Sequence, residues 1–257
     1  MSPAGSRGSG PFLYALAMNA QIGSLQDVLD DAVLTALDRR RDVMDATDED
    51  TPYGGSLGAD LGSGTYSFIG RERLDARLHF VGSAAPGPNS WLWGWNNVNG
   101  FPDAVVARAG QLRDFGQRFG IRELSDGETP LTADPKTSAT AFGAVASLIC
   151  GLPFWLLDAG QGTVGALLLE SPAFAGGPSS IVRASTVLPE AAELGLISDW
   201  SRALRSYATY RGFGIEEAPA SITLRAGDGH LVGTLDDQGR LRSLDVSAGP
   251  SVPPSAD

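Results

Sequence analysis

The stretch Trp91-Leu92-Trp93-Gly94-Trp95 is the most informative part of the sequence for the fold. Side chains alternate between the two faces of a β-strand, so a strand here would place all three indoles on one face of a sheet. Two short apolar segments precede it, at residues 64–70 and 76–82, and turn-forming residues separate all three. This pattern predicts a small antiparallel meander that ends on the tryptophan strand.

The three indoles allow two interpretations. In the first they pack beneath helices, where truncating one would cost about 3–5 kcal/mol. In the second Trp91, Trp93 and Trp95 form an aromatic platform for a sugar, peptide or flat ligand, with the Asn96 and Asn97 amides at its rim. We favour packing, and we keep these five residues as the candidate ligand site. Exposure of the indoles decides between the two.

Helical spacing of apolar residues, bracketed by capping residues, marks the rest of the chain. Helices are predicted at about 24–46, 103–119 (closed by Gly120), 135–150 (between Asp134 and Gly151), 179–195 and 198–211. Residues 47–64, rich in Asp, Gly and Pro, predict a loop. Residues 153–159 and 163–170 predict a hairpin, and residues 221–246 predict a final antiparallel set.

This order of elements predicts an α+β fold, a mostly antiparallel sheet meander with helices packed on one face. We expect three parts along the chain. Residues 1–19 form an N-terminal segment that is partly flexible, residues 20–246 form one α+β domain, and residues 247–257 form a disordered tail rich in Pro and Ser.

Gly160-Gln161-Gly162-Thr163-Val164-Gly165 matches the glycine spacing of a dinucleotide-binding loop. That motif opens a long helix, whereas Pro172 follows closely and residues 167–169 are an unbroken apolar run typical of a buried strand. We therefore interpret the glycines as a hairpin turn.

Composition excludes several function classes. The formal net charge is −11, and we find no basic patch, so binding to nucleic acid or an anionic membrane is not expected. Cys150 is the only cysteine, and with His79 and His230 it is too small a set for a zinc site. Neither histidine has a nearby Cys or His partner in the sequence. We assign no catalytic residue, no metal and no cofactor.

Apolar runs also stay below the roughly 20 residues that cross a bilayer, so we expect a soluble protein. The short apolar stretch 12–20 could belong to an export signal, but we favour a buried helix, which explains the same residues. A single free cysteine fits a reducing cytoplasm.

The tryptophan strand, Trp91-Leu-Trp-Gly-Trp-Asn96, resembles the Trp-Leu-Trp-Ala-Trp-Ala-Asn signature of an uncharacterised bacterial domain-of-unknown-function family common in actinobacteria. Gly64-Thr-Tyr-Ser-Phe68, Gly120-Ile121 and Leu235-Asp-Asp-Gln-Gly-Arg240 are similar to further short motifs of that family. Gly94 stands where the family has alanine, and the amide is shifted by one position. The resemblance implies an actinobacterial setting and brings no activity, cofactor or catalytic residue.

Three functions remain open. The chain offers few candidate catalytic residues, which favours a non-enzymatic binding or interaction protein, accessory or immunity-like. Its acidity favours a basic protein as the partner. The alternative is a pocket enzyme that acts on a small molecule through carboxylate or histidine acid/base residues near the tryptophan strand. A purely structural component of a larger assembly would instead expose a large apolar patch.

Overall fold

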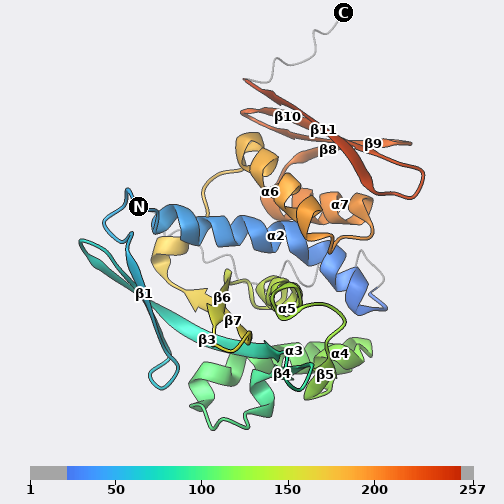
Figure 1. Ribbon diagram of the computed structural model, residues 1–257. Helices are drawn as coiled ribbons and strands as arrows, with labels where there is room; N and C mark the ends of the chain where they lie inside the picture. The colour runs from blue at the N-terminus through green and yellow to red at the C-terminus, as the bar shows by residue number, and fades with distance from the viewer. Residues whose placement is uncertain (1–21, 250–257) are drawn as a thin grey trace, which may run out of the picture.

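The structure, a computed structural model that describes residues 22–249, contains two antiparallel sheets with helices between them (Figure 1). The described helices are α2 (Leu25–Ala46), α3 (Asp103–Phe119), α4 (Arg122–Ser125), α5 (Pro135–Cys150), α6 (Ile181–Leu194) and α7 (Trp200–Arg211), with 3-10 turns η1 (Gly94–Asn96) and η2 (Pro172–Phe174). The described strands are β1 (Ser56–Asp60), β2 (Thr65–Ile69), β3 (Arg73–Ala85), β4 (Ser90–Trp93), β5 (Glu128–Pro130), β6 (Phe154–Asp158), β7 (Val164–Glu170), β8 (Gly214–Ala218), β9 (Ser221–Ala226), β10 (Gly229–Leu235) and β11 (Leu241–Ala248).

The larger sheet is built around β3. Its strand order is β1-β2-β3-β4-β5. β2 and β4 pair with different stretches along one edge of β3, β7 pairs with the other edge, and β6 pairs with β7. All of these pairings are antiparallel. The α+β class and the antiparallel meander are therefore confirmed.

Residues 47–64 are not all loop, as the sequence predicted, because β1 lies within them. Its sequence, Ser-Leu-Gly-Ala-Asp, has little of the apolar alternation that marks a strand. The strand forms because a tight turn folds it onto β2. The Asp60 carboxylate closes that turn by accepting from the Gly62 amide at 2.9 Å and the Ser63 hydroxyl at 2.7 Å.

The helix ends follow the predicted capping signals. The Ser24 hydroxyl accepts from the first turn of α2, and the Asp134 carboxylate does the same for α5. Gly120 ends α3 in the left-handed region at φ 71°, and the Ile121 amide donates back to the Gly116 carbonyl at 2.9 Å. This is the Schellman geometry expected from a glycine followed by an apolar residue.

The glycine-rich segment after β6 forms a hairpin turn, which confirms that interpretation over a dinucleotide loop. Gly160, Gln161 and Gly162 have positive φ values of 81°, 54° and 76°, and β7 follows them in place of a helix. A positive φ costs glycine less than any other residue, and glycine occupies two of these three positions.

The tryptophan strand is shorter than predicted, since β4 ends at Trp93 and the chain turns through η1. Gly94 lies against β3, where a Cβ atom would come 2.6 Å from the Phe80 carbonyl oxygen. The Asn97 amide then closes the turn on the Gly94 carbonyl at 3.1 Å. The expectation that Trp95 shares the strand and sheet face of Trp91 and Trp93 is therefore wrong.

β7 is buried on both faces and joins the core clusters of the larger sheet. Ala166 and Leu168 pack in the larger cluster, which includes α2 and α5, whereas Leu167 and Leu169 pack in a smaller cluster with Phe68 of β2. Burial of consecutive residues explains why this strand is an unbroken apolar run.

Residues 181–249, which we call the C-terminal unit, consist of α6, α7 and the smaller sheet, in the order β11-β10-β9-β8. The predicted antiparallel set at 221–246 is confirmed. The sequence missed β8, because its five residues are all exposed and include the charged Glu216 and Glu217.

Figure 1 shows the elements stacked from the larger sheet through α5, α2 and the α6–α7 pair to the smaller sheet. The main contacts of the C-terminal unit with the rest of the described chain run through α2. α2 thus connects α5, which packs on the larger sheet, to the α6–α7 pair, which packs on the smaller sheet.

The predicted disordered tail begins too early. Ser247 and Ala248 continue β11 by pairing with His230 and Gly229. Residues 250–257, and the N-terminal predictions for 1–19 including the apolar stretch 12–20, lie outside the described residues. The single-domain boundary at 20–246 stays a prediction. None of the helices within residues 22–249 is long and apolar enough to cross a membrane.

Candidate functional site

Trp91 and Trp93 lie in the core and not on a surface. Their exposed fractions are 0% and 1%. The Trp91 ring stacks on Phe142 of α5 with centroids 4.8 Å apart, and Trp93 meets the same ring edge-on at 5.1 Å. These contacts support the packing interpretation, and they leave neither indole face open to a ligand.

The other three candidate residues lie in and after η1. Trp95 is partly buried, with the Arg113 guanidinium 5.8 Å from its ring centroid. Asn97 holds its own loop together, since its side chain donates to the Phe101 carbonyl and accepts from the Phe101 amide, both at 2.9 Å. Asn96 is exposed. The five residues therefore do not form one binding face.

The tryptophan strand nevertheless positions the surface segment of residues 120–130. The Trp93 indole donates to the Glu123 carbonyl at 2.9 Å, and the Trp93 amide donates to the Gly127 carbonyl at 3.1 Å. β4 also pairs with β5, placing Leu92 opposite Glu128. The buried strand thus holds the 120–130 segment in place through Glu123, Gly127 and β5.

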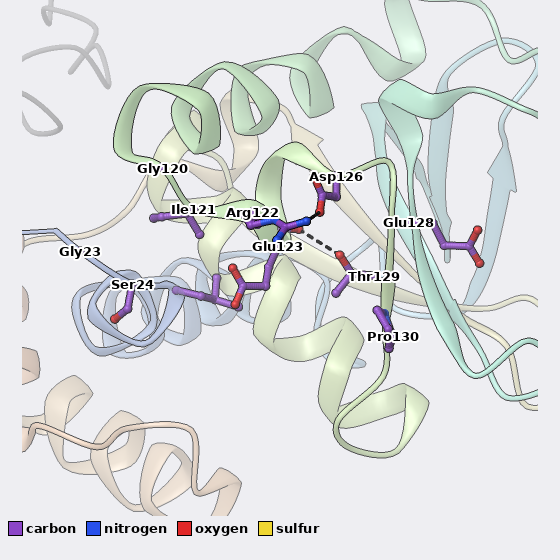
Figure 2. A pocket seen from close by; sticks show the side chains of 11 residues that line it. Gly23, Ser24, Gly120, Ile121, Arg122, Glu123, Asp126, Glu128, Thr129 and Pro130 are labelled. Carbon is purple, nitrogen blue, oxygen red and sulfur yellow. Dashed lines mark hydrogen bonds and ion pairs between the residues drawn. The ribbon is translucent and has the colours of Figure 1, made fainter.

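That segment forms one wall of an open cavity of about 470 Å³, shown in Figure 2. The opposite wall is the start of α2. The lining residues are Gly23, Ser24, Leu25, Gly120, Ile121, Arg122, Glu123, Asp126, Glu128, Thr129 and Pro130. Asn96 lies beside this wall, because a Cβ atom on Gly127 would come 2.8 Å from its Nδ2 atom.

The cavity is acidic. Glu123, Asp126 and Glu128 are all exposed, and the single guanidinium, Arg122, lies 3.5 Å from Asp126. Figure 2 shows Glu123 extending from α4 on the side of the cavity where α2 begins. The carboxyl end of α3 at Gly120 and the amino end of α2 bring helix-dipole ends of opposite sign to the cavity, so the side chains decide its charge. The lining therefore favours a positively charged group.

Glu123 and Glu128 have different freedom to bind. The Glu128 carboxylate accepts from the Ser90 hydroxyl at 2.5 Å, and in Figure 2 its side chain points away from the others. The side chain of Glu123 makes no hydrogen bond or ion pair with the part of the chain that the structure describes. Glu123 is the carboxylate most available to a partner.

His79 lies elsewhere, buried on β3 at 4% exposure. Its Nε2 atom is 3.1 Å from the Glu170 carboxylate, and Arg108 reaches the same oxygen at 4.0 Å. Burial lowers the pKa of His79, although the hydrogen bond to Glu170 opposes that shift. His79 does not line the acidic cavity, so this His–Glu pair is not presented to a ligand there.

Cys150 is a buried thiol whose Sγ atom lies 3.7 Å from the Arg108 carbonyl oxygen. Burial raises the pKa of Cys150 to about 12. A thiolate is the nucleophilic form, so this thiol is poorly suited to nucleophilic chemistry.

The carboxylates of Asp60, Asp158, Glu170 and Glu190 bind different parts of the structure and form no shared site. Asp158 caps its own hairpin by accepting from the Gly160 amide at 2.8 Å, and Asp60 caps the β1–β2 turn. Glu190 instead binds Arg40 and Arg41 of α2. In residues 22–249, no three His, Cys, Asp or Glu side chains gather closely enough to hold a metal ion.

The cavity residues were not predicted from the sequence. The only signal was local, three acids within the seven residues 122–128. Nothing in the sequence shows that the start of α2 lies across from them.

A family model matches residues 26–172, more than half of the chain. The chain belongs to DUF6882, a family of unknown function. The expected membership of an uncharacterised domain family is thus confirmed, whereas an actinobacterial origin stays a prediction. The DUF6882 match includes the 120–130 wall of the cavity and all of α2 except Leu25, and it ends before the C-terminal unit. No curated protein and no solved structure matches the chain.

Proposed function

We propose that this DUF6882 protein is a non-enzymatic binding protein that takes a positively charged segment of a partner protein in the acidic cavity. The observation that carries the proposal is the lining, in which three exposed carboxylates outnumber the one guanidinium. A lysine or arginine side chain entering there would meet Glu123, which has no competing partner in the described chain.

The character of the cavity also favours binding over catalysis. Small-molecule sites are mostly apolar and enclose their ligand. Here six of the eleven lining residues are polar or charged, and the cavity is open. The best-formed acid/base pair, His79 with Glu170, lies outside it. These features make the pocket-enzyme alternative the weaker one.

The net charge of −11 extends the argument from the cavity to the whole molecule. A surface electrostatic potential of one sign increases the association rate with an oppositely charged partner, and it makes binding sensitive to salt. An accessory or immunity-like role in the cytoplasm fits these properties, since such proteins work by occupying a partner.

A defined probe tests the proposal. Full-length protein is titrated into a fluorescent oligoarginine peptide, and anisotropy is followed at about 50 mM and about 300 mM salt, which shortens the screening length roughly twofold. We expect binding at low salt that weakens at high salt. The variant Glu123→Gln/Asp126→Asn should weaken binding about fivefold to tenfold, as expected for two partly screened charges.

The matched control is Glu193→Gln/Asp237→Asn, which removes the same charge from two exposed positions of the C-terminal unit. It should change binding by less than twofold. Equal weakening by both double variants would mean that net charge alone attracts the peptide, and the assignment to this cavity would then be rejected. Absence of binding at low salt would reject the basic partner.

A further inference from the structure

The strand β5 forms one edge of the larger sheet, and this edge opens into the acidic cavity. Within residues 22–249, β5 pairs with β4 alone, so its other side carries no strand. All three of its residues, Glu128, Thr129 and Pro130, line the cavity. An unpaired strand edge presents backbone donors and acceptors that another chain can bind.

The hydrogen bonds between β4 and β5 determine which backbone groups point outward. The Trp93 amide donates to the Gly127 carbonyl at 3.1 Å, and the Leu131 amide donates to the Asn89 carbonyl at 3.0 Å. In an antiparallel pair, residues that bond to the partner strand alternate with residues that do not. Thr129, midway between Gly127 and Leu131, therefore bonds inward to β4.

Glu128 and Pro130 are then the residues of β5 whose backbone groups point away from β4. The Glu128 amide makes no hydrogen bond with the described chain, and the residue is exposed. Pro130 has no N–H, and a proline within a sheet is tolerated where its nitrogen faces an open edge. The edge thus offers one amide and two carbonyls to a further strand.

The available carboxylate lies on one face of this edge. The Thr129 hydroxyl donates to the Glu123 carbonyl at 3.5 Å (Figure 2), and the Trp93 indole donates to the same oxygen. α4, which carries Glu123, therefore lies on the Thr129 face of β5. Every second side chain of a strand points to the same face. A strand added to β5 would direct alternate side chains toward Glu123 and Asp126.

The edge strand β8 is also acidic, but its carboxylates are occupied. Glu216 forms an ion pair with Arg225 at 2.8 Å, and Glu217 forms one with Arg205 at 2.7 Å. The side chain of Glu123 has no such partner in residues 22–249. Of these two edges, β5 is the one with a carboxylate available to a basic segment.

We propose that the basic segment of the partner binds by strand addition, extended along β5 and antiparallel to it, with basic side chains at alternate positions. This inference rests on the proposed function and adds the conformation and the residue spacing of the partner. Every pairing in the larger sheet is antiparallel, which is slightly the more stable arrangement. A basic residue opposite Thr129 would face Glu123, and its two neighbours would bond to Glu128 and Pro130.

Peptides with modified backbones separate strand addition from charge. The probe is acetyl-Thr-Arg-Thr-Arg-amide with a neutral dye, titrated with full-length protein at about 50 mM salt and followed by anisotropy. In the proposed register the threonine amides donate to β5 and the arginine amides point away. N-methylation of both threonines should weaken binding about tenfold, because it removes donors and places methyl groups between the strands. N-methylation of both arginines should weaken binding less than about threefold.

The two methylated peptides are matched, because they carry the same charge and the same number of methyl groups. Equal weakening of both, or a larger loss for the arginine set, would overturn strand addition. The proposed function would still stand if Glu123→Gln/Asp126→Asn weakens binding of the unmodified peptide. Absence of binding by the unmodified peptide would reject both.

Two variants of one residue test the same edge on the protein. Glu128→Gln and Glu128→Pro remove the same charge, but only the proline removes the outward amide and places a ring there. Glu128→Pro should bind the unmodified peptide about fivefold more weakly than Glu128→Gln. Equal affinities would contradict binding at this edge.

Hydrogen exchange of the wild-type protein replaces this comparison where Glu128→Pro does not fold. Saturating peptide should slow exchange of the outward Glu128 amide about fivefold or more, and should change the inward Thr129 amide much less. Unchanged exchange at Glu128 in the complex would overturn the proposal.

Discussion

Two buried regions of this molecule contrast in what fills them. Beneath β4, the rings of Trp91, Trp93 and Phe142 pack against one another with no charge among them. At the contact of α2 with α6 and α7, burial is just as complete at Asp38, but the neighbours are guanidiniums. Apolar packing stabilises in proportion to area, whereas a buried ion pair stabilises only while every partner is present.

Removing a ring should have the largest effect. Trp91→Ala leaves a cavity bounded by the Phe142 and Trp93 rings, and we expect the free energy of unfolding to fall by about 3–5 kcal/mol. Urea unfolding followed by circular dichroism measures it. Trp95→Ala is the comparison within the same motif, and its loss should be less than half as large because Trp95 is partly exposed. An equal loss of unfolding free energy in both variants would contradict the assignment of Trp91 to the core and Trp95 to the turn.

Removing a cation from the polar contact should come second. Arg183→Met keeps most of the side-chain volume but leaves Asp38 and Asp42 short of a partner, so we expect a loss of about 2–3 kcal/mol in unfolding free energy at neutral pH. The double variant Arg183→Met/Asp42→Asn should regain part of this loss, since it also removes the unpaired carboxylate. If the double variant is the less stable one, uncompensated charge is not the cause.

The contrast also explains which parts of the fold the sequence could predict. The helix of Asp103–Phe119 and the buried strand of 167–169 were predicted correctly, because capping residues and apolar runs are local signals. β1 and β8 were missed, because each is an exposed strand that depends on its neighbour for pairing. Local pattern carries no information about such pairing.

The candidate site shows the same limit. Alternating tryptophans correctly drew attention to 91–95, yet their position in the core depends on Phe142, about fifty residues away along the sequence. The early end of β4 depends on how closely Gly94 approaches Phe80. The acidic cavity, and the pairing of aspartates on α2 with Arg183 and Arg202, arise only when distant segments meet.

A single hydrogen bond at the polar contact should have an intermediate effect. Tyr207→Phe removes the hydroxyl that donates to Asp38 at 2.9 Å while the ring stays in place. We expect a loss of about 1.5 kcal/mol, since a hydrogen bond to a charged group exceeds a neutral one. Tyr53→Phe, at a partly buried tyrosine between α2 and β1, should lose less than about 0.5 kcal/mol. A similar loss for both would mean that the Asp38 bond contributes little.

An ion pair in solvent should have the smallest effect, although its geometry is as good as that of the buried ones. Arg205 of α7 meets Glu217 of β8 through two bonds of 2.8 and 2.7 Å, with both side chains about half exposed. Water already solvates both charges, so a double-mutant cycle with Arg205→Ala and Glu217→Ala should give a coupling of about 0.5 kcal/mol or less, falling further in salt. The same cycle on Arg202 and Asp31, at 2.5 Å but buried, should give several times more. Equal couplings would show that geometry and not burial sets the strength of these pairs, and the contrast between the two regions would then have to be drawn on other grounds.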